Sequence, residues 1–157
     1  MLEMTQEERL LQAWVTLSGM LKNTRITKGA LVYNEAIVML AVYKRYVQDG
    51  EGMTSVKDII SETNMLKSLV NRTINSLEKK GLIQRCQGTE DKRTMFVKCV
   101  RENLDVFVQV HNHSLEVAQN VMSIIGEEDA EHFVRIAKKL EASGYKPKKP
   151  VKLKGEV

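Results

Sequence analysis

Residues 54–101, TSVKDIISETNMLKSLVNRTINSLEKKGLIQRCQGTEDKRTMFVKCVR, decide the fold that we predict for this chain. A helix-capping signature opens the stretch at Ser55-Val-Lys-Asp58, a turn is expected at Thr63-Asn-Met65, and a second helix should end at Gly81. After Gly81 the spacing of apolar residues changes from about 3.6 to about 2, which is typical of a β-hairpin. Helix, turn, helix and hairpin in this order predict a winged helix-turn-helix, in which the second helix lies in a DNA major groove.

The second of these helices has two different faces. Val70, Ile74 and Leu77 recur at steps of four and three residues, so they should pack against the other helices. The opposite face carries side chains that are able to bind nucleic acid, namely Lys67, Ser68, Asn71, Arg72 and Asn75. At the tip of the hairpin, Lys92 and Arg93 add two more cationic groups.

Charge is distributed unevenly along the 157 residues. The stretch 54–101 holds ten basic and five acidic side chains, 102–143 holds three and eight, and 144–157 holds five and one, whereas 1–53 is balanced. A basic middle favours a polyanionic partner. Surface lysines that only maintain solubility would give the same imbalance, and it is the helix-turn-helix pattern that favours DNA.

Long helices are predicted on both sides of this stretch. Thr5-Gln-Glu-Glu8 is a capping box for a helix that ends near Lys22, and a second helix should cover 33–48. Two further helices are expected at 102–125 and 127–143, separated by Gly126. The apolar stripe of the first helix, which includes Leu10 and Leu17, needs either the rest of the fold or a second subunit to cover it.

Several other classes of function lack support in the sequence. The sequence has no nucleophile–base pair, glycine-rich phosphate loop or paired carboxylates that would indicate an enzyme, and we expect no cofactor. We also expect no metal site, because the side chains of His111 and His113 point about 200° apart on a helix and cannot bind one ion together. The longest apolar run is far shorter than the ~20 residues of a transmembrane helix, and the amino terminus is acidic, so we expect no membrane association and a cytoplasmic protein.

The two cysteines, Cys86 and Cys99, fit a reducing compartment. If the hairpin pairs Gln87 with Thr94, Cys86 lies opposite Met95 and Cys99 opposite Leu82, and no cross-strand disulfide is expected. A role for either thiol in redox sensing stays open, since it depends on its pKa and its accessibility.

At Leu77-Glu-Lys-Lys-Gly-Leu-Ile83, followed by Asp91-x-Arg93 and Val97, the chain resembles the MarR family of bacterial winged-helix transcription regulators. The resemblance covers residues 5–143. It implies a mainly α homodimer with a small β-hairpin wing in each subunit. The implied organisation is a helical dimerisation region at 1–32 and 102–143 and a DNA-binding region at 33–101. The lysine-rich residues 144–157 lie outside the resemblance, and their composition predicts a basic, flexible tail.

The resemblance also implies roles for individual residues. Arg93 matches the wing arginine that enters the minor groove, where Asp91 orients it, and Lys92 and Ser55 should meet phosphates. Lys67, Ser68, Asn71 and Arg72 match groove-facing positions, at which Arg72 suits guanine and Asn71 suits adenine. Leu66 and Leu69 depart from the small polar residues that are usual there, and Leu69 either touches a thymine methyl group or belongs to the core.

Together these features predict a sequence-specific DNA-binding regulator, most simply a repressor, that binds a pseudo-palindromic operator in double-stranded DNA as a homodimer. The resemblance implies relief of repression by a small-molecule effector, whose identity no residue indicates. The alternative is a winged helix used as a protein-interaction module without operator binding.

Overall fold

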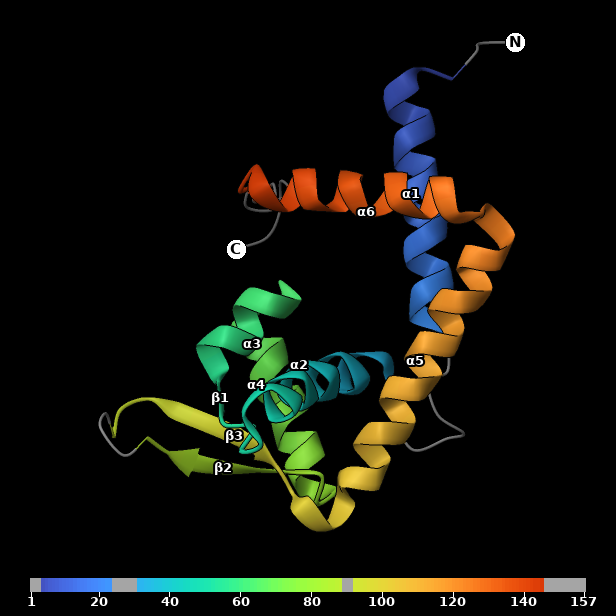
Figure 1. Cartoon of the computed structure of the whole chain (residues 1–157). Helices are drawn as coiled ribbons and strands as arrows, with labels where there is room; N and C mark the ends of the chain where they lie inside the picture. Colours follow the sequence, from blue (N-terminus) through green and yellow to red (C-terminus); the bar gives the residue numbers. More distant parts are fainter. Residues whose placement is uncertain (1–3, 24–30, 89–91, 146–157) are drawn as a thin grey trace, which may run out of the picture. The chain divides into compact units, whose positions relative to one another are not determined.

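The computed structural model describes residues 4–23, 31–88 and 92–145 of the chain. They form, in order, α1 (Gln6–Asn23), α2 (Tyr33–Asp49), β1 (Thr54–Ser55), α3 (Val56–Thr63), α4 (Lys67–Lys79), β2 (Ile83–Gln87), β3 (Met95–Cys99), a 3-10 turn (Arg101–Asn103), α5 (Leu104–Ile125) and α6 (Glu127–Ala142) (Figure 1). The predicted helices are all present, with ends that differ by at most two residues. The chain divides into two compact units, residues 1–115 and 116–157.

Helices α3 and α4 form the predicted helix-turn-helix. The Ser55 hydroxyl accepts a hydrogen bond from the Asp58 N–H at 3.0 Å and caps α3. Asn64 has a φ of 53°, and asparagine is one of the few side chains that tolerate this left-handed conformation. The chain therefore reverses between α3 and α4 at the residue that the sequence indicated.

The wing is part of a three-stranded antiparallel sheet in the order β1-β3-β2. The strand β1 was not predicted; it places Thr54 opposite Val97 and Ser55 opposite Phe96. The predicted hairpin register was wrong by one residue, because Gln87 lies opposite Met95 instead of Thr94. The turn is therefore one residue longer than expected, and Cys86 and Cys99 instead face Phe96 and Ile83. Both cysteines are free thiols.

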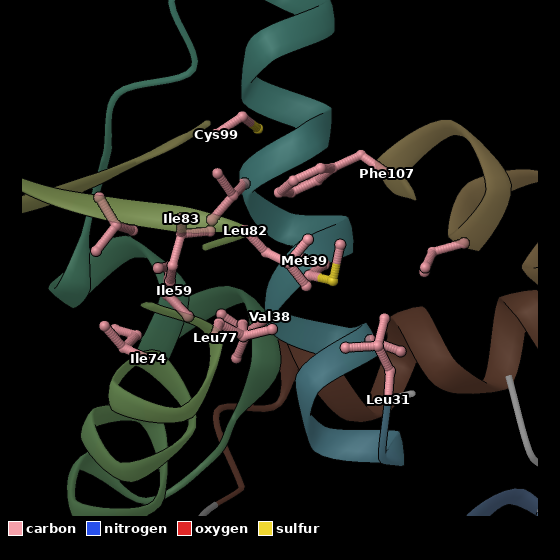
Figure 2. Packing of buried hydrophobic residues seen from close by; sticks show 14 of the residues in the cluster. Leu31, Val38, Met39, Ile59, Ile74, Leu77, Leu82, Ile83, Cys99 and Phe107 are labelled. Carbon is pink, nitrogen blue, oxygen red and sulfur yellow. The ribbon is translucent and has the colours of Figure 1, made fainter. Parts of the chain in front are cut away.

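The hydrophobic core lies within the unit formed by residues 1–115 and joins α2, α3, α4, the sheet and the first turns of α5. Figure 2 shows side chains from these elements packed together. The largest fully buried ones include Phe107, Met39, Ile59, Ile74 and Leu77. This core fixes the position of α4 within its unit, because three of the buried residues of α4 contribute to it.

Helix α1 has the predicted capping box, and most of its large apolar side chains within the described residues are exposed. The Thr5 N–H donates to the Glu8 carboxylate at 2.7 Å, and the Thr5 hydroxyl accepts from the Glu8 N–H at 3.2 Å. Its exposed apolar side chains include Leu10, Leu11, Trp14, Val15 and Met20, each between 62% and 68% exposed. In the second unit, α6 likewise exposes Phe133, Val134, Ile136 and Leu140.

Candidate nucleic-acid interface

Helix α4 presents one face to the core and the other to solvent. Val70, Ile74 and Leu77 have no exposed surface, as their spacing predicted. Among the predicted DNA-contacting residues of α4, Lys67, Ser68, Arg72 and Asn75 are exposed and Asn71 is half-buried. The helix therefore carries a polar face with two cationic side chains and a carboxamide accessible from outside.

The amino end of α4 lacks a side-chain cap. Leu66 is the N-cap residue, its side chain makes no capping hydrogen bond, and it is 74% exposed. Leu69 is half-buried and lies outside the core cluster, so the second of its two alternative roles, as a core residue, is not supported. An apolar cap leaves the first N–H groups of the helix to solvent.

Leu66→Ser is expected to raise the free energy of unfolding by about 0.5–1 kcal/mol, because a serine hydroxyl would accept a hydrogen bond from the start of α4. Urea denaturation of Leu66→Ser and Leu66→Ala measures this. The alanine variant removes the same apolar side chain without adding an acceptor. Equal stabilities for the two variants would show that the missing cap costs nothing.

A network of hydrogen bonds joins α4 to the first wing strand, β2. The Arg85 guanidinium donates through Nη1 to the Glu78 carboxylate and through Nη2 to the Asn75 Oδ1 atom, while the Arg85 backbone N–H donates to Glu78 Oε1 at 3.2 Å. The spacing of apolar residues along α4 did not predict this network, because Arg85 lies in β2, beyond the end of that helix. The opposite charges of Glu78 and Arg85, on either side of the Gly81 turn, were the available signal.

At the hairpin tip, Lys92 and Arg93 are both exposed, as expected for groups that contact DNA. Asp91, the predicted partner of Arg93, lies outside the described residues. The tip of the β2–β3 hairpin therefore carries two exposed cations, and Arg85 of β2 connects the same hairpin to α4 by its hydrogen bond to Asn75.

Ser55, a predicted phosphate contact, lies in β1 at the start of α3. It is only 8% exposed, and its hydroxyl oxygen accepts the capping hydrogen bond from the Asp58 N–H. The sequence indicated this cap but not the pairing of β1 with β3. Phosphate binding by Ser55 stays a prediction.

A buried carboxylate ties the carboxyl end of α4 to the amino end of α2. Glu35 is 3% exposed and accepts from Lys80 Nζ at 2.7 and 2.9 Å, from the Ser76 hydroxyl at 2.6 Å and from the Val32 N–H at 3.0 Å. Burial raises the pKa of Glu35, but these hydrogen bonds and the Lys80 charge outweigh it and hold that pKa below its ordinary value. Nothing in the sequence pattern predicted this interaction.

The remaining titratable candidates fit structural roles. Burial raises the pKa of the Cys99 thiol to about 11, so Cys99 is protonated at neutral pH and is a poor redox sensor. The His111 ring packs beside the Tyr43 ring, with centroids 5.6 Å apart. Across the described ranges, no three histidine, cysteine or acidic side chains converge as a metal site would require.

Comparisons with known proteins agree with this geometry. A MarR family model matches residues 45–94. YwoH, an uncharacterized HTH-type transcriptional regulator of Bacillus subtilis (strain 168), is 33% identical over 82 residues, which make up 52% of this chain and 59% of YwoH. The chain thus spans little more than half the length of this relative.

Solved structures extend the similarity over most of the chain. Sco3205 from Streptomyces coelicolor, a MarR family transcriptional regulator in complex with DNA, gives a TM-score of 0.74 at 18% identity and covers 94% of this chain and 93% of its own. Bordetella bronchiseptica BpsR, whose DNA binding is regulated by 6-hydroxynicotinic acid, gives 0.68 at 15% identity, with 87% and 98% covered. At such identities the likeness establishes the fold, which is a mainly helical winged helix-turn-helix.

None of the helices in the described ranges is both long and apolar enough to cross a membrane.

Proposed function

We propose that this chain is a sequence-specific DNA-binding transcriptional regulator of the MarR type, without catalytic activity. The observation that carries the proposal is the exposed polar face of α4, with Lys67 and Arg72, beside a wing whose tip exposes Lys92 and Arg93. A major groove accepts an α-helix, and side chains on the exposed face of that helix reach the base edges.

Each part of the interface has its own task in this proposal. Arg72 and Asn71 read base edges in the major groove, while Lys67 and Ser68 contact base edges or phosphates at the amino end of α4. Arg93, oriented by Asp91, enters the minor groove, where a narrow groove concentrates negative potential. Lys92 meets phosphate and adds sequence-independent affinity.

The regulator acts as a homodimer. Helices α1 and α6 each expose several large apolar side chains close together in the sequence, and exposed apolar surfaces of this kind mark protein interfaces. We assign α1, α5 and α6 to the interface. Two copies of α4 would then bind successive major grooves of a pseudo-palindromic operator.

In this proposal the protein is cytoplasmic and represses transcription by occluding a promoter. A small-molecule effector relieves this repression by changing the separation of the two α4 helices, since a ligand that binds one conformation better shifts the population toward it. The regulation of BpsR by 6-hydroxynicotinic acid supports effector control in a protein of this fold. The effector of this chain is not named by that similarity.

Selection of bound duplexes from a random pool tests the function and returns the half-site. We expect a pseudo-palindromic sequence whose affinity falls steeply with log[salt], because each neutralised phosphate releases counterions. Equal affinity for all sequences, or no binding at low salt, would contradict the proposal. Either result would favour the alternative of a protein-interaction module.

Arg93→Ala is expected to weaken operator binding by about 1–3 kcal/mol, because its guanidinium enters the minor groove, and to leave the dimer intact, because the interface is assigned to α1, α5 and α6 and not to the wing. Fluorescence anisotropy with a labelled operator, together with light scattering, measures both quantities. Lys92→Ala is the matched control, with a smaller loss that is uniform across sequences. Unchanged affinity in Arg93→Ala would remove the wing from the mechanism.

Arg72→Ala is expected to relax the base preference at one position of each half-site, where the guanidinium pairs with guanine N7 and O6. Affinities for operators that carry each of the four bases at that position measure the change. A loss of the same size for every sequence would instead assign Arg72 to a phosphate.

A further inference from the structure

Arg85 occupies one of the two hydrogen-bonding ends of the Asn75 side chain. A guanidinium has only N–H donors, so the carboxamide atom that faces Arg85 Nη2 is the oxygen. Exchanging the oxygen and nitrogen of Asn75 would place two donors against each other. The identity of the contacting atom therefore follows from chemistry, and the hydrogen bond from Arg85 takes one of the two lone pairs of Asn75 Oδ1 and holds that oxygen toward β2.

Glu78 keeps Arg85 in this position. Its carboxylate accepts from both Nη1 and the backbone N–H of Arg85, and the Arg85 side chain is only 27% exposed. Hydrogen bonds between two charged groups that are partly buried are stronger than hydrogen bonds between neutral groups. Asn75 is an exposed residue of α4, and while its oxygen is held toward Arg85 its Nδ2 amide keeps two N–H donors for another partner.

The bases that a carboxamide can bind in the major groove depend on whether it offers only its N–H donors or both its donors and its oxygen. Adenine offers an N6 donor and an N7 acceptor, and a carboxamide pairs with both only if its oxygen and its nitrogen both face the base edge. Guanine N7 and O6 and thymine O4 are acceptors, which the Nδ2 group alone satisfies. The same asparagine would therefore read different bases with and without Arg85.

We propose that Arg85 is a specificity-determining positioning residue, which holds Asn75 as a donor and makes it favour acceptor edges over adenine. This inference rests on the proposed function, because it requires α4 to lie in a major groove. Arg85 itself touches no base. It acts through the orientation of Asn75.

Affinities for operators that carry each of the four bases at every half-site position test this proposal. Asn75→Ala identifies the position that Asn75 reads, as the one at which base preference is lost. Wild-type protein is expected to prefer guanine or thymine over adenine there. Arg85→Met, which frees Oδ1, is expected to raise the affinity for adenine relative to guanine by about fivefold or more.

Two further variants control the experiment. Gln84→Met alters the neighbouring, exposed position on the other face of β2 and should leave the preference unchanged. Asn75→Asp keeps an oxygen toward Arg85 but leaves no donor, so it should turn the preference toward cytosine, which donates from N4. This variant shows that position 75 is read through its hydrogen-bonding groups, and if Arg85→Met does not fold, the wild-type preference between adenine and guanine at that position decides the inference.

The outcomes separate this inference from the function on which it rests. Selective operator binding in which Asn75→Ala changes no base position would overturn the inference alone, as would a wild-type preference for adenine at the Asn75 position or the same preference in Arg85→Met. Absence of any sequence-selective binding by the wild-type protein would overturn the proposed function as well.

Discussion

Trp14→Glu is expected to convert the protein to monomers and to weaken operator binding on the order of 100-fold. Trp14 is 62% exposed on α1, next to other exposed apolar residues of the same helix. A carboxylate in an apolar interface would lose its hydration without gaining a partner. Dimerisation makes the second half-site contact intramolecular, and its loss removes an avidity of roughly 10²–10⁴.

Gln12→Glu is the matched control, since it adds the same charge on the opposite side of α1 two residues away. Sedimentation and operator titration at several protein concentrations compare the two variants with the wild type. Among the residues of α1 whose burial is described, 6–20, none belongs to the core, so both variants should keep the wild-type melting transition of the winged helix. A dimeric, fully active Trp14→Glu protein would place the interface elsewhere.

Local features of the sequence predicted most of the fold. Capping boxes mark where helices begin because serine and threonine hydroxyls bind the first N–H groups of the helix that follows them, as Ser55 and Thr5 do here. Asn64 and Gly81 mark reversals because few residues adopt positive φ without strain. Each of these signals acts within a few residues, so one sequence was enough to recognise them.

Contacts between distant segments were not predictable in the same way. The strand β1 has only two residues, and it pairs with residues of β3 that lie 41 and 43 positions further along the chain. The register of the hairpin depended on a turn whose length differed by one residue from the expected one. Pattern reasoning identified β2 and β3 as strands but did not determine which residues would face each other.

The candidate interface shows the same division. The exposed face of α4 was predictable because Val70, Ile74 and Leu77 set the buried face. The interaction of Arg85 with Asn75, and the burial of Ser55 by β1, depend on the tertiary arrangement of strand and helix. The side chains that could touch DNA were thus better predicted than the bonds that orient them.

Lys80→Met is expected to lower the free energy of unfolding by about 2–3 kcal/mol at pH 7. The change leaves the Glu35 carboxylate, whose side chain is 4% exposed, without its cation. Removing one partner of a buried ion pair typically costs about 3–5 kcal/mol. The loss should be smaller here because Lys80 is 38% exposed and Glu35 keeps the hydrogen bonds from Ser76 and Val32.

The difference between Lys80→Met and the wild type should shrink as the pH falls. In the wild type the folded-state pKa of Glu35 lies below its ordinary value of 4.5, so the stability that it contributes is present above that pH and is lost as the pH falls through the lowered pKa. In the variant Lys80 no longer opposes the effect of burial on the Glu35 pKa, and protonation of Glu35 removes the unpaired negative charge.

Urea midpoints of both proteins at pH 7 and below pH 4.5 measure this pH dependence. Lys79→Met removes an exposed charge one residue away and should change the stability little at either pH. A pH-independent difference between Lys80→Met and the wild type would mean that Lys80 stabilises the protein through the packing of its aliphatic chain, and the Glu35 charge would then have no part in positioning α4.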